Sequence, residues 1–301
     1  MPHSNIESYK NKARYLRVGE HNIAYWAEFA NNAAKESTAK AKTVLFIHGF
    51  PSASWDWHWQ WEFLQKQAKS NINLVCFDLL GLGLSDKPSP YSYSLVEQAN
   101  IADTLLNHLN IKDCLIVAHD YGDSVAQSLL TRFENHQTSF SIQGICYLNG
   151  GLFAESHRPL FTQKLLKSKL GPFISKFMSK ATLSRSFNKI FGPKTPPSRA
   201  EVDVIWALLE HNNGTAALPY LLSYIDERHV FRNDWVEAMK NTQVPQLFIN
   251  GIYDPISGQH MLDKFKTLLP AAKAIGIDVG HYPQLEAPDQ LNQLLTGFVN
   301  Q

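Results

Sequence analysis

The sequence predicts an α/β fold, in which a mostly parallel β-sheet is flanked by helices and carries an inserted helical cap. Short apolar segments alternate with longer segments of helical periodicity, as in parallel strands joined by helices. Between about Leu152 and Lys240 this alternation stops, and only helical patterns remain. It resumes near Val244. We therefore expect a parallel-sheet core interrupted by a helical block.

The strands expected in the parallel core are short, apolar and followed by turn residues. They cover residues 43–47, 73–78, 114–118, 142–148, 244–250 and 273–278. Helical spacing predicts connecting helices at 95–109, 123–133, 261–269 and 289–299. Before them, residues 15–18 and 23–27 alternate between polar and apolar, which is typical of an antiparallel edge pair.

With 301 residues, the chain is long for one compact domain and short for two independent ones. We expect residues 1–151 and 241–301 to form an α/β core, with residues 152–240 inserted as a helical cap after the fourth core strand. Caps of this kind close over active sites. The insertion therefore directs the search for a site to the sheet edge that it would cover.

The charge balance excludes one class of function. Lys and Arg number 28 and Asp and Glu 27, so the chain lacks the positive footprint of a nucleic-acid-binding protein. The basic stretch from Lys164 to Arg199 is interpreted as a solvated helical face. Cys76, Cys114 and Cys146 lie far apart in apolar segments, which argues against a disulfide framework or a zinc site. We expect buried free thiols and no metal or cofactor.

The sequence contains no recognisable targeting or membrane-spanning segment. Its N-terminal residues lack the apolar centre of a signal peptide. No stretch approaches the roughly 20 apolar residues that cross a bilayer. These features predict a soluble, cytoplasmic protein, either a monomer or a homodimer, whose partners are small molecules.

The segment AHDYG, directly after the strand at 114–118, carries the strongest chemical signal. Small residues two before and two after Asp120 permit the sharp strand-to-helix turn called a nucleophile elbow. Such a turn lifts Asp120 above the sheet edge, where the N-terminus of the next helix favours an ionised carboxylate. Taken alone, Asp120 is equally compatible with an ordinary helix N-cap.

The expected partners of Asp120 follow other strands. An HGFP loop comes after the first core strand, so the N–H groups of Phe50 and Tyr121 are the predicted oxyanion hole. Asp254 follows the first strand after the helical block, and His281 follows the last strand. Asp278 competes with Asp254, but it is expected within the last strand. Nucleophile, acid and histidine thus occur in order at the carboxyl ends of parallel strands, where α/β sheets bind ligands.

The segments HGFP, DLLGLGLSDKP, HDYGD, GIYDP and GHYPQLE resemble the epoxide hydrolase and haloalkane dehalogenase branch of the α/β-hydrolases. The likeness extends over nearly the whole chain. With HGFPSASWDW, LNGGLFAESHRPL and FGPKTPPS, the chain resembles in particular the mesoderm-specific transcript group. The resemblance implies an α/β-hydrolase fold, a nucleophile at Asp120, a charge-relay acid at Asp254 and a base at His281.

An Asp nucleophile determines the type of reaction. A carboxylate needs no activation and displaces a leaving group from saturated carbon, whereas Ser suits attack on a carbonyl. The product is an alkyl ester of Asp120, which water activated by His281 then hydrolyses. The oxyanion of this second step forms on the Asp120 carboxyl, and Asp254 holds the imidazole. A small hydrophobic organic molecule and water are the expected substrates.

Two leaving groups are compatible with this scheme, and the first is an epoxide oxygen. It needs an acid, which the resembling family supplies from a pair of cap tyrosines. Tyr224 is the best-placed candidate and Tyr220, one helical turn away, is the second. His157 is a candidate substitute for the family's first tyrosine. Each tyrosine is equally compatible with simple packing in a cap helix.

The second leaving group, a halide, needs N–H donors, commonly a Trp after the nucleophile and another donor beside the HG loop. Tyr121 and Phe50 occupy these places, which favours the epoxide. Trp55 and three further tryptophans, at 57, 59 and 61, are expected to line or support the pocket wall. Asp123 either suits the dipole of the helix after the elbow or raises the pKa of Asp120. An inactive hydrolase fold that serves as a binding or scaffold protein is the remaining alternative.

Overall fold

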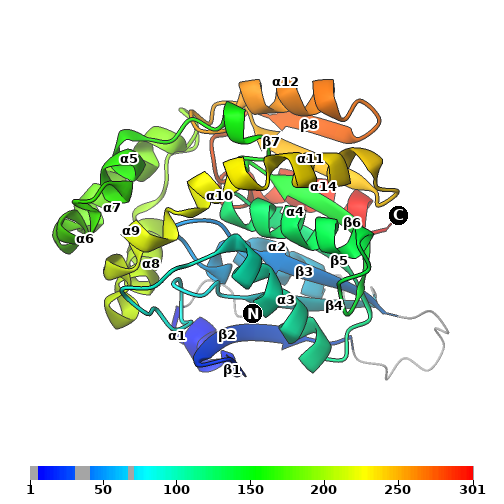
Figure 1. Cartoon of the computed structure of the whole chain (residues 1–301), viewed down its shortest axis with the longest axis horizontal. Coiled ribbons are helices and arrows are strands. Elements are labelled where there is room, and N and C mark those ends of the chain that lie inside the picture. The colour runs from blue at the N-terminus through cyan, green and yellow to red at the C-terminus, as the bar shows by residue number, and fades with distance from the viewer. Residues whose placement is uncertain (1–5, 31–40, 67–70, 301) are drawn as a thin grey trace.

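Eight strands form a single sheet at the centre of the molecule (Figure 1). The structure, a computed structural model, describes residues 6–30, 41–66 and 71–300. The strand order is β1-β2-β4-β3-β5-β6-β7-β8. All pairs formed between strands β3 to β8 are parallel. The β1–β2 and β2–β4 pairs are antiparallel. The predicted α/β class is confirmed, with its antiparallel pair at one edge.

The strand bounds agree closely with the segments that the sequence predicts. They are β1 Arg14–Val18, β2 His21–Glu28, β3 Lys42–Ile47, β4 Ile72–Phe77, β5 Asp113–His119, β6 Ser141–Leu148, β7 Gln246–Gly251 and β8 Lys273–Ile277. β7 begins two residues later than predicted, since Pro245 has no N–H for the ladder. β8 ends before Asp278, so this residue lies outside the strand in which it was expected.

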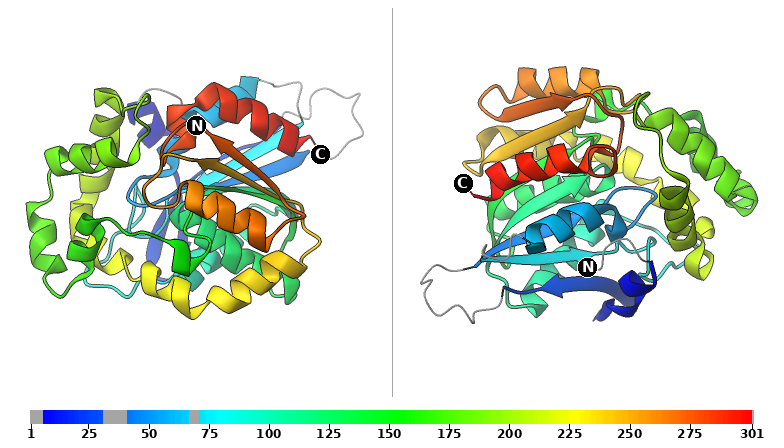
Figure 2. Two further views of the ribbon diagram at one scale, coloured as in Figure 1. Left: turned by 90° about the horizontal axis from the view of Figure 1, so that it is seen from above. Right: turned by 180° about the vertical axis from the view of Figure 1, so that it is seen from behind.

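Helices cover both faces of the sheet (Figures 1 and 2). On one face lie α3 Leu95–His108, α4 Tyr121–Glu134, α11 Arg232–Asn241 and α12 Gln259–Leu268. On the other lie α2 His58–Lys66 and α14 Pro288–Val299. Because α11 packs against α4, the range expected as a cap includes one helix that belongs to the layer on the sheet. Outside the helical block, four helices were not predicted: α2 and the shorter α1 Ile6–Asn11, η1 Ser54–Trp57 and α13 Pro283–Glu286.

Between β6 and α11 the chain forms a separate group of short helices beyond the carboxyl ends of the parallel strands (Figures 1 and 2). They are η2 Ala154–Ser156, α5 Phe161–Lys167, α6 Gly171–Ile174, η3 Ser175–Phe177, α7 Lys180–Ile190, α8 Arg199–Glu210, η4 His211–Ala216, α9 Leu218–Leu221 and α10 Tyr224–Val230. Ser179 and Ser198 start α7 and α8, since each hydroxyl accepts a hydrogen bond from the backbone N–H three residues on.

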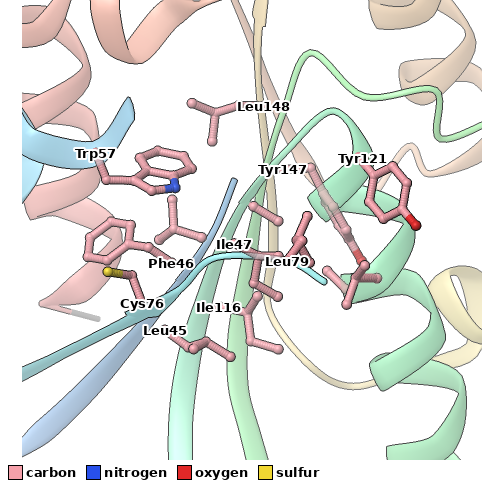
Figure 3. Packing of buried hydrophobic residues seen from close by; sticks show 14 of the residues in the cluster. Leu45, Phe46, Ile47, Trp57, Cys76, Leu79, Ile116, Tyr121, Tyr147 and Leu148 are labelled. Atoms are coloured by element: carbon pink, nitrogen blue, oxygen red, sulfur yellow. The ribbon is translucent and has the colours of Figure 1, made fainter. Parts of the chain in front are cut away.

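Apolar side chains from the parallel strands and from the helices on both faces make one continuous core. Figure 3 shows Phe46 and Trp57 on one side of the strands and Tyr121 and Tyr147 on the other. All four are buried, and the rings of Phe46 and Trp57 lie 5.2 Å apart. The three cysteines are buried free thiols, as predicted. This packing fixes the strand ends, and therefore the loops that follow them.

Candidate active site

Asp120 lies at a sharp turn between β5 and α4. Its backbone adopts φ 48° and ψ −104°, a conformation that residues other than glycine rarely take. Gly122 permits the turn, because a Cβ there would lie 2.5 Å from the Ile47 carbonyl oxygen. The Asp120 side chain makes no capping hydrogen bond to α4, so the N-cap interpretation is wrong. Its carboxylate is therefore available for other partners.

A backbone N–H group contacts the Asp120 carboxylate. The Phe50 N–H donates to Oδ2 of Asp120 at 3.2 Å. Gly49 permits this close approach, since a Cβ on it would lie 2.6 Å from Nδ1 of His119. The Tyr121 N–H occupies the first position of α4, where no helical carbonyl accepts it. Of the two N–H groups that the sequence predicts as an oxyanion hole, that of Phe50 contacts the Asp120 carboxylate and that of Tyr121 belongs to the residue after it.

His281 is paired with Asp254. Its Nδ1 lies 2.7 Å from Oδ2 of Asp254, and both side chains are buried. Asp254 also accepts hydrogen bonds from the Asn149 amide, the Ser257 hydroxyl and the backbone N–H groups of residues 256 and 257. Asp278, the competing acid, is exposed at the surface. The geometry therefore selects Asp254 as the partner of the imidazole.

The charges of this cluster control its protonation. Burial raises the pKa of Asp120, but the positive charges of His281 and Arg228 outweigh it and hold that pKa below its ordinary value. Burial also opposes a charged imidazole, yet the carboxylates of Asp254 and Asp120 raise the pKa of His281 to about 9. At neutral pH, Asp120 is therefore a carboxylate and His281 an imidazolium.

Arg228, on α10, is a residue of the site that the sequence motifs do not contain. Its side chain is 1% exposed, and its NH2 group donates to the Asp120 carbonyl (2.9 Å) and approaches Oδ1 of Asp120 at 3.5 Å. Its Nε donates to the Ser124 hydroxyl at 2.7 Å. The guanidinium also lies over the Tyr224 ring, 4.5 Å from its centroid. A spacing of four residues from Tyr224 puts both on one helix face, the signal by which Arg228 could have been found.

Tyr224 and His157, both from the helical segment, lie close to Phe50, Tyr121 and Arg228. Tyr224 is fully buried, and its ring lies 4.9 Å from that of Tyr121 and 6.0 Å from that of Phe50. Its hydroxyl accepts a hydrogen bond from Gln163 at 3.4 Å, so its own proton is left for another acceptor. His157 Nδ1 faces the Arg228 guanidinium at 3.3 Å, and burial lowers the pKa of His157 to about 3. This imidazole is neutral.

The Asp123 carboxyl is buried at the base of the elbow, against β6. It accepts a long hydrogen bond from the Leu148 N–H (3.4 Å), and Gly150 lies so close that a Cβ there would overlap its Oδ2. Burial, reinforced by the charge of Asp120, raises the pKa of Asp123 well above the usual range. A neutral Asp123 adds no second negative charge beside Asp120 and none to the helix dipole.

Tyr220 and Trp55 are the two remaining residues that the sequence proposes for the substrate site. Tyr220 lines a surface cavity of about 560 Å³ with Tyr91, Lys167 and Asp226. Trp55 is buried and stacks on His58 with ring centroids 4.1 Å apart. In the described part of the chain, the side chains that hydrogen-bond or pair with Asp120 do not include either residue. The three tryptophans that follow Trp55 at alternate positions lie on η1 and α2 rather than on a strand. Trp57 and Trp61 are therefore buried in the core, whereas Trp59 is 40% exposed.

The loop that carries His281 is held from both sides. Its N–H donates to the Ile190 carbonyl of α7 (2.8 Å), and its own carbonyl lies 2.8 Å from Nε2 of His119. Glu286 accepts the N–H groups of Gly192, Gly280 and Tyr282 and the hydroxyl of Thr195. The helical segment and the histidine loop are therefore one hydrogen-bonded unit.

A family model described as the alpha/beta hydrolase fold matches residues 42–288. This chain belongs to the α/β-hydrolase fold family. It is 40% identical to the mesoderm-specific transcript protein of Mus musculus over 265 residues, which are 85% of this chain and 78% of that protein. It is 24% identical to the cis-3-alkyl-4-alkyloxetan-2-one decarboxylase of Shewanella oneidensis over 276 residues, 87% of this chain and 83% of that one.

Among solved structures, the haloalkane dehalogenase DatA from Agrobacterium tumefaciens shares the fold. It superposes with a TM-score of 0.74 over 96% of both chains, at 16% identity. Within the described ranges, no group of three or more His, Cys, Asp and Glu side chains is arranged to hold a metal ion. Across the same ranges, no helix has the length and apolarity that a bilayer crossing requires.

Proposed function

We propose that this hydrolase forms a covalent alkyl ester between Asp120 and a small apolar substrate, and that the substrate is an epoxide. The observation that carries the proposal is the setting of the Asp120 carboxylate. It stands on a strained elbow, accepts the Phe50 N–H at 3.2 Å, and is kept ionised by its positively charged neighbours. A carboxylate held in this way needs no base to act as a nucleophile.

In the first step, Oδ1 of Asp120 attacks an epoxide carbon, since its contact with Arg228, at 3.5 Å, is longer than that of Oδ2 with the Phe50 N–H, at 3.2 Å. A carbon–oxygen bond to Asp120 forms, the strained ring bond breaks, and its electron pair stays on the epoxide oxygen. Tyr224 donates a proton to that oxygen. Burial and the Asp120 charge raise the pKa of Tyr224, so the phenol stays protonated until the alkoxide forms.

His157 is the second proposed donor to the epoxide oxygen. When its Nδ1 accepts from Arg228, its proton stands on Nε2, which is buried without a hydrogen-bond partner in the described part of the chain. A neutral imidazole N–H stabilises an alkoxide without transferring its proton. His157 thus supplies the donor for which the sequence has no second tyrosine.

In the second step, esterification has removed the negative charge of Asp120, one of the two that raise the pKa of His281. The imidazolium therefore loses its proton more readily, and the Tyr224 phenolate left by the first step takes up that proton by way of solvent. Neutral His281 then takes a proton from water, and the hydroxide attacks the ester carbonyl. The oxyanion is stabilised by the N–H groups of Phe50 and Tyr121. Collapse expels the alkoxide, which takes the proton from His281 to complete the diol. The carboxylic acid left on Asp120 then returns a proton to His281, which restores the starting carboxylate and imidazolium.

A strained oxygen ring is favoured over a carbon–halogen bond. The side chains of Phe50 and Tyr121 offer no N–H to a departing halide, whereas Tyr224 offers an O–H to a nascent alkoxide. The name of the Shewanella relative gives an alkyl-substituted oxetan-2-one, also a strained oxygen ring, as the compound it acts on. One observation favours the halide instead, namely the buried indole N–H of Trp55, which has no partner among the described residues.

The covalent scheme is tested by a single turnover in ¹⁸O-labelled water, with enzyme in excess over a small aryl epoxide. We expect unlabelled diol and ¹⁸O in the Asp120 peptide, because the first oxygen transferred comes from the carboxylate. The Asp120→Asn variant is the inactive control. Diol that carries ¹⁸O in the first turnover contradicts the scheme, since water has then attacked the epoxide directly.

The choice of epoxide is tested with a matched pair of tyrosine variants. Tyr224→Phe is expected to lower epoxide turnover by about 10²–10⁴-fold, the usual contribution of a general acid. Tyr220→Phe, one helical turn away in the surface cavity, is expected to leave turnover unchanged. Release of halide from matched haloalkanes without diol formation from epoxides establishes the dehalogenase instead. Inactivity on both panels, with Asp120 unmodified, favours a binding protein.

A further inference from the structure

Residues 161–177, here called the outer helices, comprise α5, α6 and η3. They contain five of the ten large apolar side chains that are exposed in the described part of the chain. The exposed fractions are 76% for Phe161, 37% for Leu165, 64% for Leu170, 61% for Phe173 and 68% for Phe177. Single exposed apolar residues are normal, whereas such a concentration marks an interaction surface.

The chain around the outer helices is strongly basic. From residue 156 to residue 200 it contains no Asp or Glu, although the whole protein is nearly neutral. In the same stretch ten side chains are cationic: Arg158, Lys164, Lys167, Lys169, Lys176, Lys180, Arg185, Lys189, Lys194 and Arg199. Only Lys167 and Lys180 form ion pairs seen in the described residues, with Asp226 and Asp203. The basic stretch is thus more than the solvated helical face that the sequence suggests, because it accompanies exposed aromatic rings.

The outer helices touch the candidate active site through Gln163, which donates to the Tyr224 hydroxyl, while their exposed apolar side chains face solvent. Together with α7, they lie at one end of the molecule, away from the sheet (Figure 1). α5 packs on α6, and the rings of Phe173 and Phe177 lie 5.1 Å apart and edge to face. Lys164, Lys169 and Lys176 are exposed beside them. Aromatic and cationic side chains therefore project together from one end of the molecule.

We propose that the outer helices dock the protein on an anionic lipid surface. Short amphipathic helices bind bilayers when Phe and Leu enter the headgroup boundary and Lys side chains meet acidic headgroups. A second copy of this chain fits less well. A two-fold dimer through this surface would place each basic stretch against itself, so that like charges repel. The inference goes beyond the proposed hydrolase activity and does not depend on it.

The test is vesicle flotation with the full-length Asp120→Asn variant, so that lipid chemistry plays no part. Vesicles of phosphatidylcholine alone are compared with vesicles that also contain phosphatidylglycerol. We expect binding to the anionic vesicles that weakens as salt is added, because exposed charges are screened. Failure to bind anionic vesicles at low salt overturns the proposal, as does equal binding to both compositions.

Variants then assign the binding to the outer helices. The double variant F173A/F177A is expected to weaken partitioning by about tenfold or more per phenylalanine, from the apolar surface that each would bury. Lys169→Gln and Lys176→Gln are expected to weaken it by about fivefold each. Tyr15→Ala removes an aromatic side chain that is 56% exposed on the edge strand β1, and is the matched control with unchanged partitioning.

Circular dichroism of these variants verifies that they remain folded, as does hydrolysis of a water-soluble substrate by the same substitutions in the wild-type enzyme, since both are expected to be unchanged. Sedimentation velocity tests the alternative interpretation, in which the outer helices join two copies of this chain. If the protein dimerises without lipid, F173A/F177A abolishes the dimer and no vesicle binding occurs, the surface is an interface between copies and the proposal is wrong. Vesicle binding that the phenylalanine variants do not alter also overturns it.

Discussion

The guanidinium of Arg228 joins the nucleophile position to the helical segment that covers it. It reaches the backbone and the carboxylate of Asp120, the hydroxyl of Ser124 and the imidazole of His157. Burying a charge is costly unless hydrogen bonds and an opposite charge compensate for it. Arg228 has both, and in return it helps to keep Asp120 ionised. Arg228 thus helps to orient the proposed nucleophile and, together with His281, keeps it charged.

Arg228→Met is therefore expected to raise the pKa of Asp120 and to move the acid limb of the pH–rate profile to higher pH. The loss of a buried, paired charge should also lower the free energy of unfolding by about 3–5 kcal/mol. Arg228→Lys keeps a charge without the planar fork and should give intermediate values. Urea unfolding and the pH dependence of kcat/KM measure the two effects. An unchanged acid limb in a folded Met variant would exclude this electrostatic role.

The protonation of His281 provides a second prediction at this scale. The carboxylates of Asp254 and Asp120 together raise the pKa of His281 to about 9. Asp120→Asn removes one of these charges without changing the shape of the side chain. We expect the pKa of His281 in this variant to be lower than in the wild type, as proposed for the ester intermediate. NMR titration of the imidazole measures it, and an unchanged or higher value contradicts the proposed second step.

The same shift makes folding stability depend on pH. The pKa of His281 is higher in the folded protein than the ordinary value of 6.5, so the folded state binds the proton more tightly. This contribution is fully present below about pH 6.5 and is lost as the pH rises through about 9. The wild type should therefore lose more stability than His281→Gln over that window. Urea unfolding at several pH values checks this difference, and parallel curves for the two proteins would refute it.

The loop after β8, which carries His281, is held in place by hydrogen bonds to other elements. Gly280 and Tyr282 donate to Glu286 at the end of α13, while the His281 N–H donates to α7. The same carboxylate receives the Gly192 N–H and the Thr195 hydroxyl from the chain after α7. Four donors converge on one acidic side chain. The orientation of His281 thus depends on contacts between elements that are far apart in sequence.

Glu286→Gln is expected to disturb this arrangement, because an amide group replaces one acceptor oxygen and must face N–H donors. An unsatisfied buried donor costs about 1–3 kcal/mol, and misplacement of His281 lowers kcat by as much as about 10²-fold. Thr195→Val removes one hydrogen bond to Glu286 and is the mild control. Chemical denaturation and steady-state kinetics provide the measurements. Wild-type kcat in Glu286→Gln would show that the loop is held without this carboxylate.

For the molecule as a whole, the sheet order explains why distant motifs meet. β3 lies between β4 and β5, so the winding of the chain changes direction there, and the loops after β3 and β5 diverge around a crevice. Phe50 and Asp120 follow these two strands. Asp254 and His281 follow β7 and β8 on the same side of the sheet. Parallel strands bring all four to one edge, and the buried core keeps that edge fixed.

A pair of tryptophan variants tests how far this core supports the whole fold. Trp57 is fully buried against Phe46, whereas Trp59, two residues on, is 40% exposed. Trp57→Ala should lower the free energy of unfolding by about 3–5 kcal/mol, as large core truncations do. Trp59→Ala should change it by no more than about 0.5 kcal/mol. Similar losses in guanidinium unfolding would contradict the burial pattern.

Much of this architecture follows from local sequence signals. The parallel strands, the main helices and the break after β6 were predictable because apolar periodicity and turn residues act over a few neighbouring positions. The elbow at Asp120 was predictable for the same reason, since small residues on both sides permit the turn. Asp254 and His281 could be proposed as partners of Asp120 because each of the three residues follows a predicted strand and they occur in this order along the chain. These features depend on residues close together in the sequence.

Only the tertiary structure decided the rest. Arg228 and Glu286 join segments about a hundred residues apart, and no local pattern encodes a contact of that kind. Tyr224 and Tyr220 look alike in sequence, yet packing buries one beside Phe50 and leaves the other in a surface cavity. The state of Asp123 likewise depends on complete burial, which raises its pKa. Charge, burial and long-range contact are properties of the folded chain, because they arise when distant segments exclude water from one another.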